Sequence, residues 1–328
     1  MRNLNKKSKQ QGVALITVLM IVAIMVTIAA TMTGRLTQSL QRTEGIIFAQ
    51  SVYWYGQAAA DLGKKILEDD FSDSSVVSLD QMWATEGMIF PLENGHIAGE
   101  MKDLRSCFNL NAVGLADKDD IRAIPVQQLQ ILLEELEISS YDAETIAEST
   151  RDWIDENDQS TASQGAEDSF YAARAVPHLA ANSLMVDISE LRSVQGVSAE
   201  IYEKISPYLC AIPSTEQKIN VNTVSRDQAE ILYALFKDEL EITVTGLQDW
   251  LDDRPTSGWA SVDEFLAVSL FDDLDASSPV KGQLSVESDF FQLNGLAEFS
   301  DRLLAVDLVF QMNAQKAKVI RYQSGGFK

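Results

Sequence analysis

Histidine, cysteine and the common catalytic motifs are scarce in this chain of 328 residues. It has two histidines, two cysteines and 7 prolines. It contains no Gly-Lys-Ser/Thr phosphate loop, no Gly-x-Ser-x-Gly nucleophile elbow, no His-Glu-x-x-His zinc motif and no Cys-x-x-Cys pair. The histidines, His96 and His178, are far apart in sequence and have no serine or cysteine in a catalytic pattern beside them. The sequence therefore argues against an enzyme, and His96 is expected to be a surface residue.

Positive charge is also in short supply. The chain has 26 lysines and arginines against 49 aspartates and glutamates, and its formal net charge is −23. A nucleic-acid surface requires a basic patch, so we expect no nucleic-acid partner. The composition suits an extracytoplasmic body with room for cations, although a solvated acidic surface accounts for most of these carboxylates.

A long uncharged stretch near the N-terminus dominates the pattern. No charged residue lies between Lys9 and Arg35. A bilayer core of ~30 Å requires about 20 apolar residues in a helix, so residues 13–34 are long enough to cross it. The basic residues before this stretch would keep the N-terminus in the cytoplasm and place the rest of the chain outside it. Apolar residues three and four apart continue the pattern and predict one helix from Val13 to about Leu67.

The small residue Gly12 stands between the basic leader and the apolar stretch. An ordinary secretory signal has its small residues after the apolar region instead. The arrangement resembles the type IV pilin and pseudopilin class, in which a prepilin peptidase cuts after the glycine and methylates the new N-terminus. The resemblance implies a leader of residues 1–12, cleavage between Gly12 and Val13, and methylation of Val13. A plain signal-anchor helix is the alternative interpretation of this segment.

The fifth residue after Gly12 departs from the pattern of that class. Most members have glutamate at this position, and this chain has Thr17. A carboxylate buried in lipid is unfavourable unless it is paired, and in these filaments it is thought to pair with the N-terminal amine of a neighbouring subunit. A subunit at the tip has no subunit above it, so the absence of the glutamate carries no penalty there.

Alternating apolar and polar residues predict an antiparallel sheet in two separated parts. The predicted strands are 88–93, 96–104, 286–299, 302–311 and 317–322, with turns at 93–96, at Asn294-Gly295 or Ser300-Asp301, and at Asn313-Ala314. The residues between the two parts are mostly helical in composition. We therefore predict an α+β fold in which a long pilin-like N-terminal helix packs on an antiparallel β-sheet, with a large all-α domain inserted in the sheet.

The predicted insert, residues 107–283, shows an internal repeat. Asn109-Leu110-Asn111, a helix pair and Asp152-Trp153-Ile154-Asp155 recur as Asn220-Val221-Asn222, a helix pair and Asp249-Trp250-Leu251-Asp252. The repeat predicts two related helical units, about 107–213 and 214–283. The pilin-like domain is then formed by residues 35–106 and 284–328.

Taken together, the blocks resemble the minor pseudopilin K family of type II secretion. The shared features are the Gly12 junction without the glutamate, Cys107-Phe108-Asn109-Leu110-Asn111, Asp152–Asp155, Gly165-Ala166-Glu167-Asp168 and Asn220-Val221-Asn222-Thr223. The resemblance implies a single-pass inner-membrane protein with a periplasmic body, at the tip of a pseudopilus that drives folded exoproteins outward. Its partners would be other minor pseudopilins of the I and J types, prepilin peptidase and the inner membrane. The alternative is a signal-anchored periplasmic binding module, which an intact N-terminus at Met1 would favour.

An acidic loop is the strongest candidate site. Five carboxylates lie between Asp155 and Asp168, separated by small polar residues. Calcium takes six to eight oxygen ligands, but this is not an EF-hand, because the sixth position is Ser160 and the twelfth is Ala166. Spacing alone leaves an exposed acidic loop as the simpler interpretation. The family resemblance implies a calcium site, with Asp155, Asp158, Glu167 and Asp168 as ligands and Asp152 or Glu156 behind them. A weaker candidate cluster contains Asp252, Asp253, Asp272, Asp273 and Asp275.

The two cysteines, Cys107 and Cys210, are a candidate disulfide. A periplasmic body permits such a bond. Closing a loop of ~100 residues would stabilise the fold by up to ~4.7 kcal/mol in the chain-entropy model. Two buried thiols remain the alternative, because the sequence does not give the distance between their Cα atoms.

Overall fold

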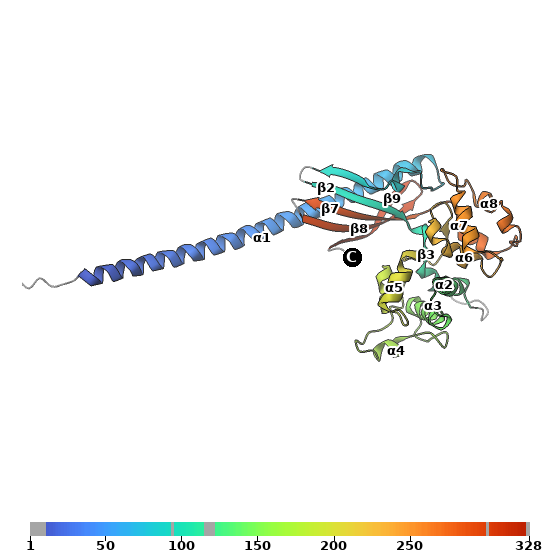
Figure 1. Cartoon of the computed structure of the whole chain (residues 1–328), viewed down its shortest axis with the longest axis horizontal. Coiled ribbons are helices and arrows are strands. Elements are labelled where there is room, and N and C mark those ends of the chain that lie inside the picture. The colour runs from blue at the N-terminus through green and yellow to red at the C-terminus, as the bar shows by residue number, and fades with distance from the viewer. Residues whose placement is uncertain (1–10, 93–94, 115–121, 300–301, 326–328) are drawn as a thin grey trace, which may run out of the picture.

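A long helix and a head at its far end make up the molecule (Figure 1). The computed structural model describes residues 11–92, 95–114, 122–299 and 302–325. Helix α1 (Gln11–Asp73) begins near the predicted junction, and residues 13–44 along it are exposed. Its apolar part, with a mean hydropathy of 2.9, is long and apolar enough to cross a membrane. The C-terminal part of α1 packs on the sheet.

The helix was predicted to end near Leu67, but it continues through the acidic residues 68–70 to Asp73. Two of these acids, Glu68 and Asp70, have hydrogen-bond partners outside the helix. Glu68 accepts hydrogen bonds from Lys316 and from the backbone of Ala317. Asp70 accepts from the backbone N–H groups of Met82 and Trp83 at 3.2 and 2.9 Å. These contacts fasten the end of the helix to the sheet and to the loop that follows it.

The sheet has five antiparallel strands in the order β1-β2-β7-β8-β9. The strands are β1 (Met88–Leu92), β2 (Gly95–Asp103), β7 (Phe290–Phe299), β8 (Arg302–Asn313) and β9 (Lys316–Gly325). One face packs against α1 in a core that includes Leu67, Trp83, Phe291 and Phe310. This confirms the predicted α+β fold, with a sheet formed by two separated parts of the chain.

One of the two alternative turns was wrong. Asn294-Gly295 lies inside β7, where Gly295 stands opposite Gly99 and Val306. An ideal Cβ on Gly99 would come within 3.0 Å of the Asn294 carbonyl oxygen, so glycine here permits close strand approach rather than a turn. The other predicted turns, 93–96 and 300–301, lie partly or wholly outside the described residues. The turn at Asn313-Ala314 is confirmed, and Ala314 has a φ of 53°.

The insert leaves the sheet after β2 and returns before β7, so it interrupts neighbouring strands (Figure 1). Its helices are α2 (Ile124–Glu135), α3 (Ser140–Ile154), α4 (Asp168–Ala172), α5 (Ala199–Ile205), α6 (Glu230–Phe236), α7 (Val244–Asp252) and α8 (Val262–Phe265). It is not strictly all-α, because it holds two short parallel ladders. In these, β3 (Phe108–Asn109) pairs with β4 (Leu209–Cys210), and β5 (Ile219–Asn220) pairs with β6 (Leu284–Ser285). Each ladder joins the start of one unit to the region where that unit ends.

The second asparagine of each repeat makes the same pair of backbone hydrogen bonds in both helical units. The Asn111 side chain accepts from the Met185 N–H at 2.7 Å and donates to the Met185 carbonyl at 3.0 Å. The Asn222 side chain makes the same pair of bonds with Trp259, also at 2.7 and 3.0 Å. A buried amide thus replaces a backbone partner at the same place in each unit.

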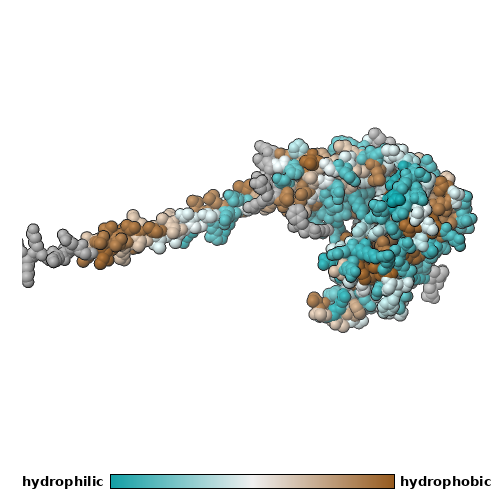
Figure 2. All heavy atoms as spheres, in the orientation of Figure 1, coloured by the Kyte–Doolittle hydropathy of each residue, from teal (hydrophilic) through white to brown (hydrophobic). Residues whose placement is uncertain are grey.

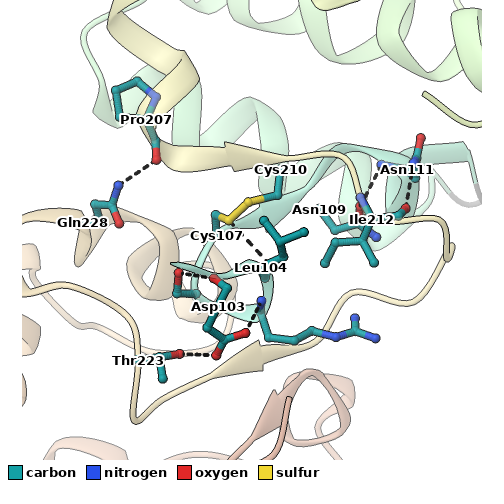
Figure 3. The surroundings of a disulfide bond; sticks show 12 residues. Asp103, Leu104, Cys107, Asn109, Asn111, Pro207, Cys210, Ile212, Thr223 and Gln228 are labelled. Atoms are coloured by element: carbon teal, nitrogen blue, oxygen red, sulfur yellow. Dashed lines mark hydrogen bonds between the residues drawn. A yellow bond between two sulfur atoms is a disulfide. The ribbon is translucent and has the colours of Figure 1, made fainter. Parts of the chain in front are cut away.

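Side chains join the insert to the sheet where the chain crosses between them. Cys107 and Cys210 form a disulfide with their Cα atoms 5.7 Å apart, close to Asp103 and Thr223 (Figure 3). Arg105, of which 4% of the side chain is exposed, donates to both carboxylate oxygens of Asp289 at 2.8 and 3.2 Å. The disulfide therefore ties together the two ends of the first helical unit, and the Arg105–Asp289 ion pair ties together the two crossings of the chain between sheet and insert.

Candidate functional site

Three acidic side chains meet where α3 ends. Asp152 is in the last turn of α3, Asp155 caps that helix, and Glu167 precedes α4. One carboxylate oxygen from each lies within 4.8 Å of the other two. Asp152 is fully buried, Glu167 is 4% exposed, and Asp155 is partly buried. The chain thus places three carboxylates together in a largely desolvated position.

Local structure explains why these residues converge. Asp152 and Asp155 are three residues apart, so they share one face of the helix end. The loop beyond them turns back through local hydrogen bonds, in which Asp155 accepts from the Asn157 N–H at 3.1 Å and Asn157 accepts from the Gln159 N–H at 2.9 Å. The C-terminal end of a helix carries partial negative charge, which disfavours carboxylates there and favours a cation.

The electrostatics of the cluster follow from burial and mutual repulsion. Burial raises the pKa of Asp152 to about 6, against hydrogen bonds that lower it. Burial, with the added negative charges of Asp152, Asp155 and Asp168, raises the pKa of Glu167 to about 7. Burial also raises the pKa of Asp155. Burial is the largest cause of all three pKa shifts, and it outweighs the opposing positive charge of Arg151 at Asp152 and Asp155.

The buried oxygens fit a hard cation. Asp152 Oδ2 and both Glu167 carboxylate oxygens are buried without a hydrogen-bond partner among the described residues. Such groups are costly to bury unless they are bound, and three carboxylates with a polar loop beside them supply the oxygen ligands that calcium takes. An ideal Cβ on Gly165 would lie 2.0 Å from Asp152 Oδ2 and 2.5 Å from Ser160 Oγ, so glycine leaves space beside the carboxylate.

The structure groups only part of the predicted ligand set. Asp155 and Glu167 lie in the cluster. Asp158 is exposed and lies outside it, and Asp168 accepts a hydrogen bond from the Ala180 N–H at 3.0 Å. Asp152, expected behind the ligands, faces the cluster directly. The three-residue spacing of Asp152 and Asp155 is the sequence signal that could have identified it.

The residues of the weaker acidic cluster and the two histidines contact local partners away from the three-carboxylate cluster. Asp252 accepts from Arg226 Nε at 2.7 Å, and Asp275 accepts from the Ser277 N–H at 2.7 Å, so the weaker acidic cluster is divided among local partners. His96 lies on β2, 3.6 Å from a Glu298 carboxylate oxygen. The His178 ring packs at a tilt against the ring of Tyr171 and edge to face against that of Trp153, in the insert.

The N-terminal junction lies in the first turn of α1. Gly12 and Val13 are helical, and residues 1–10 lie outside the described part of the chain. The Thr17 hydroxyl donates to the Ala14 carbonyl at 2.9 Å, so it is satisfied within its own helix. This residue offers no negative charge to another chain.

Comparison with known proteins gives consistent matches. Two models of the family "Type II secretion system (T2SS), protein K" match residues 106–214 and 219–287. Type II secretion system protein K of Aeromonas hydrophila is 37% identical and aligns with 97% of this chain and 98% of its own length. The protein K of Pectobacterium carotovorum subsp. carotovorum is 34% identical, with 98% of both chains covered.

A solved structure matches as well. A chain of the GspK-GspI-GspJ complex from the enterotoxigenic Escherichia coli type 2 secretion system superposes with a TM-score of 0.79 at 37% identity, covering 87% of this chain and 100% of that one. The first family model ends at residue 214 and the second begins at residue 219, close to the predicted boundary between the two helical units. This chain therefore belongs to the type II secretion system protein K family of minor pseudopilins, as a structural component and not an enzyme.

Proposed function

We propose that this protein is the tip subunit of the pseudopilus, where it initiates and caps the filament that drives folded exoproteins across the outer membrane. The observation that carries the proposal is the position of the insert, beyond the end of α1 and of the sheet (Figure 1). In a filament of parallel stalk helices, a head of this size obstructs the place where the next subunit would stack. Thr17 replaces the glutamate of other subunits, and its hydroxyl donates to the Ala14 carbonyl in the same helix. The chain therefore has no carboxylate here to pair with the N-terminal amine of a neighbouring subunit.

The same proposal includes location and partners. The exposed apolar part of α1 would anchor the chain in the bacterial inner membrane with its body in the periplasm. Prepilin peptidase would cleave after Gly12 and methylate Val13. The related complex contains GspI and GspJ, so the partners of this chain would be the corresponding minor pseudopilins, which would pack along α1.

The tip position is tested by labelling sheared pseudopili with an antibody against the helical insert, and with an antibody against the major subunit as the control. We expect the insert antibody to mark one end only, with a copy number that does not rise with filament length. Label along the shaft would overturn the proposal. Mass spectrometry of the mature N-terminus should find methylated Val13, whereas an intact Met1 would favour an anchored binding module.

We further propose that Asp152, Asp155 and Glu167 bind calcium. The unpartnered buried oxygens of Asp152 and Glu167 support this, as does the polar loop that can add carbonyl ligands. Bound calcium would neutralise the cluster and order residues 155–168. A ligand present at 100 times its dissociation constant stabilises a fold by ~2.7 kcal/mol.

Thermal unfolding of the full chain in detergent micelles tests the calcium site. We expect excess chelator to lower the melting temperature and added calcium to restore it, while magnesium restores less because it demands a tighter octahedral arrangement. An identical melting curve in chelator and in calcium would refute the site.

A further inference from the structure

The loop that follows α4 has an unusual composition for this chain. Residues 173–186 contain no aspartate or glutamate, although the chain has 49 acidic residues. Val176, Leu179 and Val186 within it are 77%, 61% and 65% exposed. Apolar residues also gather on the part of the head that holds α4 (Figure 2). Exposed apolar side chains on a segment without regular structure keep a defined position only if the backbone is tethered.

The tethers of this loop lead to the acidic cluster. The Ala180 N–H donates to Asp168 at 3.0 Å, and the Asn182 N–H donates to the Trp153 carbonyl at 3.0 Å. Trp153 directly follows Asp152 in the chain, and Asp168 directly follows Glu167. Each tether is therefore attached to the immediate neighbour of a carboxylate with at least one buried oxygen that has no hydrogen-bond partner among the described residues.

An aromatic contact adds a third tether from the same elements. The ring of His178 lies 5.1 Å from that of Tyr171 in α4 and 6.0 Å from that of Trp153 at the end of α3. The Trp153 and Tyr171 rings pack edge to face at 5.1 Å. Movement of α4 relative to α3 would separate these rings and release the loop.

The far end of the loop is fastened to the sheet. Arg321 on β9 donates to the Val186 carbonyl at 2.6 Å and pairs with Asp187 at 3.1 Å. The same guanidinium pairs with Asp307 on β8 at 3.1 Å. These three charged side chains are 12–14% exposed, so the pairing is partly desolvated and resists screening by salt. Residues 173–187 thus run from the acidic cluster to the sheet.

We propose that a cation bound by Asp152, Asp155 and Glu167 acts as a latch for loop 173–187, so that its binding sets the position of an apolar surface and the contact between insert and sheet. This inference rests on the calcium site proposed above. Without a cation the three carboxylates repel one another, and the connection that can relieve the repulsion is loop 155–168, which leads directly into α4. Opening that loop shifts Asp168 and Tyr171, and the tethers of residues 173–187 are lost.

Hydrogen exchange measured by mass spectrometry on the full chain in detergent micelles tests the latch. Exchange in the presence of calcium is compared with exchange in excess chelator. We expect peptides from residues 173–187 to exchange about tenfold or more faster in chelator, while peptides from α2 and α6 in the insert core do not change. Calorimetric titration of the same sample measures calcium binding independently.

Two matched substitutions in one loop sharpen the test. Asp155→Asn removes a cluster carboxylate, so we expect it to abolish both calcium binding and the calcium-dependent protection of residues 173–187. Asp158→Asn changes an exposed carboxylate outside the cluster and should preserve both. If calcium binds to the unmodified chain but protection of residues 173–187 is the same with and without it, the latch is refuted while the site stands. If calcium does not bind, the site itself is refuted.

A third variant separates the two ends of the loop. Arg321→Gln removes the attachment to the sheet without touching the cluster. In the unmodified chain we expect calcium to slow hydrogen exchange in β9, because the loop is fastened there. The variant should still bind calcium and protect the backbone near Asn182, but calcium should no longer slow exchange in β9. If calcium still slows exchange in β9 of this variant, the proposed route through Arg321 is wrong.

Discussion

Replacing Asp103 with alanine should loosen the junction between insert and sheet. Asp103 is 1% exposed at the end of β2. Its Oδ2 accepts from the hydroxyls of Ser288 and Thr223, each at 2.6 Å, and from the Asn220 amide at 3.2 Å. Its Oδ1 accepts from the Arg105 N–H at 2.7 Å. One carboxylate at the end of β2 thus gathers donors from the second helical unit and from both crossings of the chain between sheet and insert.

The loss of stability in Asp103→Ala depends on which of the four donors keep another acceptor when the carboxylate is removed. Thr223 also donates to the Asn220 carbonyl at 3.3 Å, and Asn220 also donates to Val77 and Ser288. The Ser288 hydroxyl and the Arg105 N–H would be left without an acceptor. A buried donor without a partner costs about 1–3 kcal/mol, so two of them predict a loss of roughly 2–4 kcal/mol once relaxation is allowed for.

The assay is denaturant unfolding of the full chain in micelles, combined with hydrogen exchange of peptides from β2, β5 and β7. Asp103→Ala should lower the local opening free energy of these strands by that amount. Asp103→Asn keeps the shape and one acceptor oxygen, so its loss should be smaller. Asp238→Ala removes an exposed carboxylate and serves as the control, with an expected change within ~0.5 kcal/mol. If Asp103→Ala matches that control, the network does not hold the junction.

Two further changes test the Cys107–Cys210 disulfide and the proposed calcium site. Replacing Cys107 and Cys210 together with serine should destabilise the insert by up to ~4.7 kcal/mol, the chain-entropy limit for a loop of about 100 residues, and non-reducing electrophoresis or thiol labelling of the unmodified chain should find no free thiol. Gly165→Ala places a methyl group against Asp152 Oδ2 and should weaken calcium binding about tenfold or more by calorimetry, whereas Gly282→Ala, where the methyl group would meet open space, should leave it unchanged; equal affinities would contradict the placement of Asp152.

Periodicity predicted most of the sheet and stalk because their determinants are local. An apolar face repeated every three or four residues indicates α1, and alternation indicates β2 and β8, whatever the rest of the chain does. The end of α1 was missed because Glu68 and Asp70 are held by Lys316 and Trp83, which are remote in sequence or outside the helix. Boundaries of this kind depend on tertiary partners, which a local pattern cannot contain.

The sequence indicated where carboxylates would gather but not which of them would lie together, for the same reason. The composition of residues 155–168 indicates an acidic loop, but the choice between Asp152 and Asp158 depends on where α3 ends and how the loop turns back. Asp103 gave no signal at all, because its partners Thr223 and Ser288 are 120 and 185 residues away. Asn294-Gly295 was one of two alternative predicted turns, because glycine has the same local signature whether it permits a turn or a close approach of strands.

The two helical units keep one asparagine framework but balance their acids in different ways. In the second unit Asp252, which corresponds to Asp155 in the repeat, is paired with Arg226, so its counter-charge is part of the chain. In the first unit a longer loop brings Glu167 to Asp152 and Asp155, and on the calcium proposal a cation from solution balances them. The stability of the first unit should therefore depend on dissolved cations and that of the second should not. On the calcium proposal, loop length, more than the shared Asp-Trp-x-Asp motif beside it, separates a metal-dependent unit from a metal-independent one.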